Sequence, residues 1–168
     1  MADMERLKAL TGQYGLKLIE DAAEALGTCY NQGTYHGQFA GTIGDFGAYS
    51  FNGNKIITTG GGGLLTAKDG RDLERAKYLA AQAKDDPFHY THNEVGYNYR
   101  MTNLQAALGV GQLECLEDFI RIKEINYEYY GNAITSTENF ELLKFNQKAR
   151  NNRWFYSLFI KNDGLDRN

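Results

Sequence analysis

Hydrophobic residues recur along the chain at spacings that alternate between those of helices and strands. Residues 3–12 show helical spacing and predict a helix that stops near Gly12. Residues 15–20 then predict a short strand with Asp21 at its carboxyl end, and residues 22–26 predict the start of a short helix. In open parallel sheets, ligands bind at the carboxyl ends of the strands. Asp21 is therefore well placed for a ligand contact.

Further strands are predicted on both sides of a glycine run. Residues 31–47 hold five glycines without a strict repeat and predict a long active-site loop. Residues 47–51 predict a strand, and the Asn-Gly turn signal that follows it presents Lys55. Residues 64–67, after four consecutive glycines, predict another strand.

The remainder of the chain predicts helices followed by a small strand-containing region. Residues 69–83 have the spacing of a surface helix. Thr102 and Gln105 match a capping box ahead of a long amphipathic helix. Residues 140–145 and 154–160 predict strands of a small α+β domain that packs one face on that helix.

Composition narrows the class of protein. The chain has 168 residues, 42% of them hydrophobic, which is enough for a packed core. Its net charge of -3 and its lack of a long basic run argue against binding to nucleic acid or membrane surfaces. No stretch reaches the roughly 18 apolar residues of a membrane-spanning helix. Cys29 and Cys115 are isolated thiols, which suit a reducing compartment. We therefore expect a cytoplasmic protein with small-molecule or subunit partners.

Lys55 and Asp21 together suit the chemistry of pyridoxal phosphate (PLP). A lysine on a glycine-rich turn can form a Schiff base with the cofactor aldehyde, and a strand-end carboxylate can keep the pyridine nitrogen protonated. Taken singly, each residue has a plainer interpretation, because most turn lysines are solvated and most strand-end aspartates cap a turn.

Two other features favour plain interpretations. The glycines at 60–63 favour a flexible hairpin connection over a phosphate-binding loop. In a Walker motif the lysine is followed by Ser or Thr, whereas Lys55 is followed by Ile56. His89 and His92 lie near Pro87 without a nearby acid pair, so a solvated or substrate-facing loop is favoured over a metal site. We expect no metal.

Three blocks resemble a known family. They are Leu-Ile-Glu-Asp-Ala-Ala-Glu-Ala-Leu-Gly at 18–27, Gly-Asp-Phe-Gly-Ala-Tyr-Ser-Phe-Asn-Gly-Asn-Lys at 44–55, and Gly-Tyr-Asn-Tyr-Arg-Met-Thr-Asn-Leu-Gln-Ala-Ala at 96–107. In this order they resemble the nucleotide-sugar aminotransferases of the DegT/StrS type, which are PLP enzymes. The resemblance implies an α/β chain with part of the aspartate-aminotransferase fold, followed by part of a small α+β domain.

The resemblance also implies a domain organisation. Residues 1–100 would be the C-terminal half of the PLP-binding large domain, residues 101–134 a long interdomain helix, and residues 135–168 an incomplete small domain. Because family members are roughly twice this length, the chain is expected to be an internal fragment that is inactive alone.

Site residues follow from the same resemblance. Lys55 matches the Schiff-base lysine, which also moves the proton between substrate and cofactor. Asp21 matches the partner of the pyridinium nitrogen, and Ser50 matches a phosphate contact. Asn98 matches a residue donated across a homodimer interface to the neighbour's phosphate, so shared active sites are expected.

Glu24 departs from the pattern of many relatives, which have glutamine there and Gly-Glu-Gly-Gly in place of the four glycines. We still place Glu24 among the cofactor-binding residues. A carboxylate beside the cofactor's ring oxygen would repel it, so Glu24 must be protonated, turned aside or offset by a nearby cation.

The implied function is transfer of an amino group, with glutamate as donor, to the 4-keto carbon of a nucleotide-linked deoxy sugar. Several motifs are similar to enzymes that aminate UDP-linked 4-keto-6-deoxy-N-acetyl sugars. One alternative is a PLP-dependent sugar dehydratase, against which Lys55 speaks because such relatives carry histidine there. The other is a non-catalytic remnant or an oligomerisation module.

Overall fold

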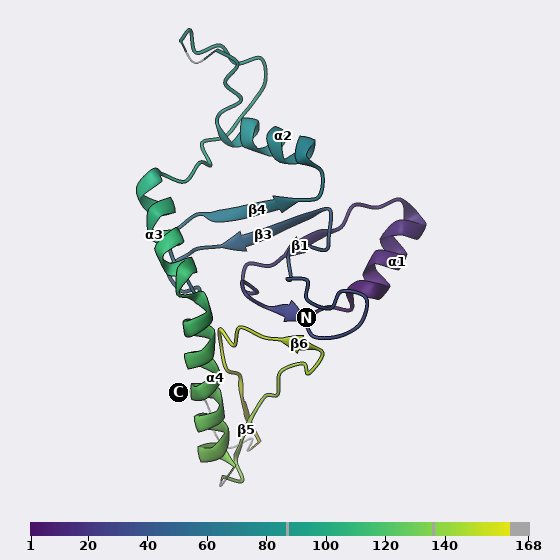
Figure 1. Cartoon of the computed structure of the whole chain (residues 1–168), viewed down its shortest axis with the longest axis vertical. Coiled ribbons are helices and arrows are strands. Elements are labelled where there is room, and N and C mark those ends of the chain that lie inside the picture. The colour runs from purple at the N-terminus through teal and green to yellow at the C-terminus, as the bar shows by residue number, and fades with distance from the viewer. Residues whose placement is uncertain (87, 136, 162–168) are drawn as a thin grey trace.

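The computed structural model describes residues 1–86, 88–135 and 137–161 and consists of a small sheet flanked by a long helical arm (Figure 1). In the part of the chain that the model covers, no helix is both long and apolar enough to cross a membrane. The elements in chain order are α1 (Met4–Tyr14), β1 (Ile19–Asp21), β2 (Cys29–Tyr30), β3 (Phe46–Ser50), β4 (Gly63–Ala67), α2 (Gly70–Ala80), α3 (Asn103–Glu114), α4 (Leu116–Ile134), β5 (Phe140–Leu142), β6 (Ala149–Arg150) and β7 (Leu158–Ile160).

The sheet has the order β1-β3-β4 and is mixed. Strands β1 and β3 are parallel, with Asp21 opposite Ala48, while β4 runs antiparallel to β3, with Gly63 opposite Ser50. The predicted strands in these regions are confirmed. Because β1 and β3 are parallel, their carboxyl ends meet at one edge, which brings Asp21 and Ser50 to the same side of the sheet.

One of the two predictions near the amino terminus is wrong. Helix α1 ends at Tyr14, close to the predicted end near Gly12, and Gly15 caps it with a left-handed φ of +63°, which suits glycine. The short helix predicted for residues 22–26 is absent. That segment is a pair of turns, in which the N–H of Ala25 donates to the carbonyl of Ala22 and the N–H of Thr28 donates to that of Ala25.

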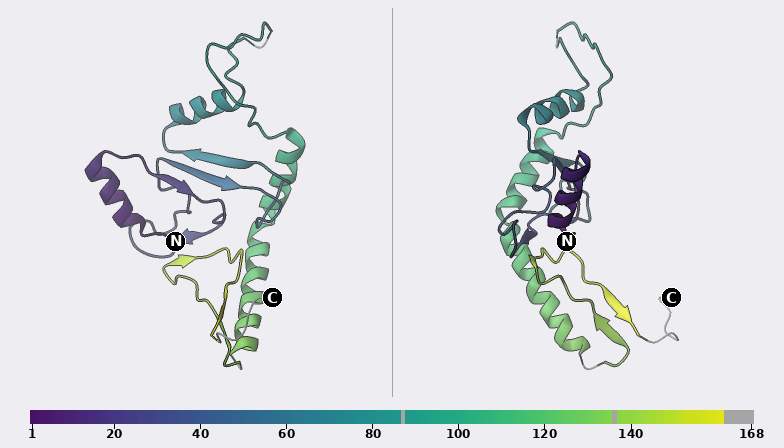
Figure 2. Two further views of the ribbon diagram at one scale, coloured as in Figure 1. Left: turned by 180° about the vertical axis from the view of Figure 1, so that it is seen from behind. Right: turned by 90° about the vertical axis from the view of Figure 1, so that its right-hand side faces the viewer.

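The long amphipathic run forms two helices that meet at Cys115. Helix α3 lies beside the sheet, and α4 continues past it alongside the carboxyl-terminal strands (Figures 1 and 2). The capping box of Thr102 and Gln105 is confirmed at the start of α3. The core lies where α4 begins, because Leu116 and Ile120 are buried against Ile57. This packing anchors the segment that immediately follows Lys55.

The carboxyl-terminal region contains short strands and much irregular backbone. Strand β5 pairs antiparallel with β7, but the strand predicted for residues 154–160 forms only over its last three residues. Strand β6, which was not predicted, pairs with β2. This pairing brings the irregular segment at 151–157 next to the turns that follow β1.

Candidate active site

Lys55 lies on the turn that follows β3. Its backbone N–H donates to the carbonyl of Asn52 at 3.1 Å, and the N–H of Asn52 donates to the hydroxyl of Ser50 at 3.3 Å. The Lys55 side chain is only 13% exposed. The Asn-Gly turn signal therefore presents the lysine as predicted, but it does so into a shielded position.

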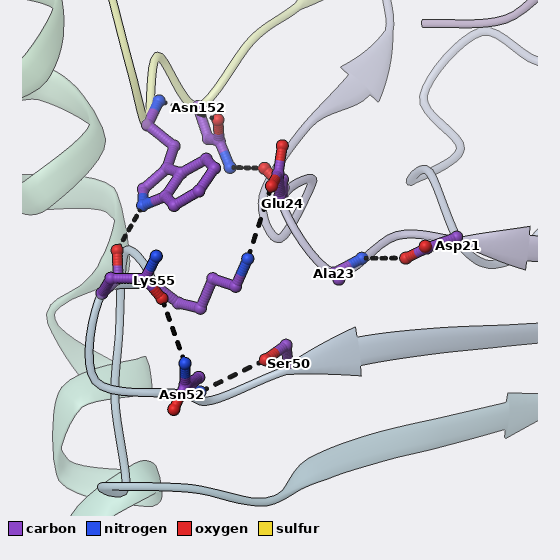
Figure 3. Close-up of polar contacts among 9 residues, drawn as sticks. Asp21, Ala23, Glu24, Ser50, Asn52, Lys55 and Asn152 are labelled. Carbon is purple, nitrogen blue, oxygen red and sulfur yellow. Dashed lines mark hydrogen bonds and ion pairs between the residues drawn. The ribbon is translucent and has the colours of Figure 1, made fainter.

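The side chain of Lys55 extends toward Glu24 across the gap between two turns (Figure 3). Its Nζ atom lies 3.5 Å from Oε1 of Glu24. It also lies 4.4 Å from the centre of the Trp154 ring. The structure therefore brings together two residues named from the sequence and one that was missed.

Asp21 stands at the carboxyl end of β1, ahead of the turn that carries Glu24 (Figure 3). Its Oδ1 accepts the backbone N–H of Ala23 at 3.1 Å. This contact is the turn cap that the plainer interpretation expected. One carboxylate has more than one acceptor position, so Asp21 can cap the turn and still accept from a ligand.

Strand β1 is held in place by Glu20, which sequence reasoning missed. Its carboxylate accepts backbone N–H groups from Gly41 at 2.8 Å, Ile43 at 2.6 Å and Gly44 at 2.5 Å. These contacts tie the glycine-containing loop to the strand that ends in Asp21. Burial, followed by the charge of Glu20, raises the pKa of the neighbouring Tyr49, whose hydroxyl donates to Ala40.

Ser50 ends β3 at the same edge of the sheet. Its oxygen accepts from Asn52, and within the described ranges no group accepts its hydroxyl proton. This hydroxyl can donate to an anionic oxygen, as a phosphate contact requires. The nearby glycines at 60–63 lead into β4, which pairs antiparallel with β3, so they belong to the hairpin connection that the plainer interpretation favoured. Gly60 and Gly62 have positive φ.

Asn98 is not brought to this group. It is exposed, and its backbone forms a bridge with Ala81 at the end of α2. In the part of the chain that the structure describes, no hydrogen bond or ion pair joins it to Lys55, Asp21 or Ser50. The segment between α2 and α3 extends beyond α2, away from the carboxyl-terminal strands (Figures 1 and 2).

A hollow of about 550 Å³ lies beside the carboxyl end of β1. Asp21, Glu24 and Trp154 line it, whereas Lys55 and Ser50 do not. Lys55 instead reaches Glu24 from the adjacent turn. The amine of Lys55, the carboxylate of Asp21 and the hydroxyl of Ser50 lie at one sheet edge. PLP requires these three groups: a covalent tether, a partner for the pyridine nitrogen and a contact for the phosphate. The residues present therefore fit this cofactor.

Comparison with known proteins supports this interpretation. The model of the DegT/DnrJ/EryC1/StrS aminotransferase family matches residues 1–168. EpsN of Bacillus subtilis, described as a candidate PLP-dependent aminotransferase, is 40% identical over 96% of this chain and 40% of its own length. The GDP-perosamine synthase of Vibrio cholerae is 37% identical over 98% of this chain and 42% of its own length.

Solved structures show the same fold. An aminotransferase from Psychrobacter cryohalolentis superposes with a TM-score of 0.80 at 27% identity, covering 98% of this chain and 45% of that one. The aminotransferase TlmJ from Streptoalloteichus hindustanus gives a TM-score of 0.81 at 26% identity, over 90% of this chain and 40% of that one. The chain thus spans less than half the length of the relatives it matches, and its fold is part of the aspartate-aminotransferase fold. It belongs to the DegT/DnrJ/EryC1/StrS family of PLP-dependent aminotransferases.

Proposed function

We propose that this chain carries the cofactor-binding lysine of an enzyme that moves an amino group from glutamate to the 4-keto carbon of a nucleotide-linked deoxy sugar. The observation that carries the proposal is the shielded Lys55 side chain, held at the sheet edge where Asp21 and Ser50 also end. The named relatives support a nucleotide-sugar substrate, since GDP-perosamine synthases are among them.

Each residue has a role in this proposal. PLP, when bound, supplies an electron-withdrawing ring that makes the amino-bearing carbon acidic. Lys55 attaches the cofactor and, once released by the donor, carries a proton between the substrate and cofactor carbons. Asp21 holds the proton on the pyridine nitrogen, and Ser50 donates to the phosphate.

Glu24 faces the same site from the opposite turn. In the chain without cofactor, the cation beside its carboxylate is Lys55, 3.5 Å away. We propose that Lys55 gives up this pairing when its nitrogen attaches the cofactor, which leaves the carboxylate of Glu24 beside the ring oxygen.

We also propose that the active enzyme is a homodimer with shared sites. Asn98 is exposed and separate from the other candidate residues, as a residue that acts on a neighbouring subunit would be. Ser50 is the one residue of this chain that we assign to the cofactor phosphate. We therefore expect the 168-residue chain alone to bind PLP weakly and to transfer no amino group.

Covalent trapping tests the proposal. The chain is incubated with PLP, reduced with borohydride and digested, and the modified peptide is identified by mass spectrometry. Label on Lys55 supports the proposal, whereas label on Lys17, Lys68 or Lys77 with Lys55 unmodified contradicts it. An assay with glutamate and either a GDP-linked or a UDP-linked 4-keto deoxy sugar then separates the two substrate classes. Turnover by the 168-residue chain alone would show that the expectation of inactivity is wrong.

A further inference from the structure

We propose that Asn152 and Trp154 form a clamp that positions Lys55 and Glu24, a role that rests on the proposed function of Lys55. The clamp comes from the irregular segment between β6 and β7, a hundred or more residues away in sequence from the turns that it holds. Neither residue is part of the three blocks that carry the family resemblance.

Trp154 holds the turn of Lys55 at two points. Its indole Nε1 donates to the backbone carbonyl of Asn54 at 2.6 Å, which fixes the residue immediately before the lysine. Its ring lies 4.4 Å from the Lys55 Nζ. Trp154 is 8% exposed and the Lys55 side chain 13%, and an ammonium–ring attraction is stronger when water is excluded.

Asn152 holds the opposite turn. Its Nδ2 donates to the backbone carbonyls of Glu24 at 2.8 Å and Leu26 at 2.9 Å, as Figure 3 shows for Glu24. Its Oδ1 accepts the N–H of Trp154 at 3.1 Å, so the two members of the clamp are tied to each other. One tripeptide, whose first and last residues are buried, therefore fixes both turns that meet at the candidate site.

The residue between them adopts a rare backbone conformation. Arg153 has a φ of +50°, which residues other than glycine seldom adopt. Its guanidinium lies 4.4 Å from the ring centre of Tyr127 and pairs with Glu124 at 3.1 Å, so α4 holds it from the outside. Unfavourable backbone conformations persist where the surroundings fix them, often at functional sites.

The reactivity of Lys55 tests the clamp without any cofactor. The chain is labelled with limiting acetic anhydride, and acetylation of Lys55 is compared with that of Lys17, whose side chain is 71% exposed. Trp154→Leu removes both contacts and is expected to raise the Lys55-to-Lys17 ratio about fivefold to thirtyfold. Trp154→Phe keeps the ring over the lysine and should stay within about threefold of wild type. Phe159→Leu, an exposed aromatic change on β7, is the matched control and should not alter the ratio.

The result that overturns the proposal is a Trp154→Leu chain with native helix content and an unchanged ratio. Should that variant fail to fold, the contact is tested from the other side. Trp154 is the only tryptophan, so it gives a single indole N–H resonance. Lys55→Met should shift this resonance and Lys17→Met should not. An indole N–H resonance in Lys55→Met at the wild-type position would overturn the proposal.

A cofactor readout separates this inference from the proposed function. PLP absorbs where tryptophan emits, so binding at the site should quench Trp154 fluorescence in wild type. Trp154→Leu should also reduce the fraction of PLP that borohydride traps on Lys55, and Trp154→Phe should restore part of it. Acetylation as expected, with PLP trapped on Lys17, Lys68 or Lys77 and not on Lys55, would contradict the proposed function alone, whereas PLP trapped equally on Lys55 in all variants would contradict the clamp.

Discussion

The Nζ atom of Lys55 lies 3.5 Å from Oε1 of Glu24, a residue 31 positions earlier in the chain. This contact joins the turn after β3 to the turn after β1. In the chain without cofactor it also puts a cation beside the carboxylate at position 24. The Glu24 side chain is 64% exposed, so the pair contributes little to stability and its importance is local.

Glu24→Gln is expected to change the free energy of unfolding by less than about 0.5 kcal/mol, because the ion pair is largely solvated. The same change should tighten PLP binding, because it removes a negative charge from beside the ring oxygen. Urea unfolding and an absorbance titration measure the two effects. Glu20→Gln is the matched control: it should cost about 1–3 kcal/mol, since the carboxylate of Glu20 accepts three backbone N–H groups. Weaker PLP binding by Glu24→Gln would contradict the charge argument.

Ser50→Ala is expected to weaken the binding of PLP and to leave the binding of pyridoxal, which lacks the phosphate, unchanged. The reason is that only the phosphate uses the hydroxyl proton of Ser50. A hydrogen bond from a neutral donor to a charged group contributes about 1.5–3 kcal/mol, so the dissociation constant for PLP should rise about tenfold or more. Parallel titrations with both compounds check this, and equal losses for the two would show that Ser50 acts through the fold.

Asn98 is expected to act on the neighbouring subunit. A mixed dimer of one Lys55→Ala and one Asn98→Ala subunit places both lesions in one site and leaves the other intact. Equal mixing should therefore recover about a quarter of wild-type activity, because half the dimers are mixed and each has one working site. Activity is measured on the dimeric enzyme, with each variant alone as control. No recovery, while both variants still dimerise, would place Asn98 within its own subunit or outside the mechanism.

Asn152→Ala is expected to destabilise the chain by about 2–4 kcal/mol. Asn152 is 5% exposed, and its side chain makes hydrogen bonds to the backbone of Glu24, Leu26 and Trp154, which would be left unsatisfied. Denaturant unfolding followed by circular dichroism measures the loss. The neighbouring Asn151→Ala loses only two longer contacts of 3.3 Å and should cost less. Similar losses for the two variants would contradict this account.

The pH dependence of stability is expected to include a contribution from Asp45, immediately before β3. The backbone N–H of Leu18, 2.8 Å away, lowers the pKa of Asp45 below its ordinary value of 3.8. A carboxyl group with a lowered pKa stabilises the folded state above pH 3.8, and this stability is lost as pH falls through the folded-state pKa. Wild type should therefore exceed Asp45→Asn in stability near neutral pH, and the gap should shrink in acid. Urea unfolding across this range checks it, and a constant gap would contradict it.

Features that depend on neighbouring residues could be predicted from the sequence. Strands β3 and β4 follow from runs of β-forming residues, and the start of α3 follows from Thr102 and Gln105, whose contacts lie within one helical turn. The position of Lys55 after an Asn-Gly turn is local in the same sense. Residues 162–168, the last part of the expected small domain, lie outside the described residues.

The arrangement of the candidate site was decided by the tertiary structure. Glu20 caps a loop more than 20 residues away, and Asn152 and Trp154 reach turns 100 or more residues away. The turns at 22–28 stand where a helix was predicted, and Asn152 ties them to the carboxyl-terminal segment by donating to Glu24, Leu26 and Thr28. No local pattern encodes such contacts, since each forms only when the folded chain brings buried polar groups within hydrogen-bonding distance.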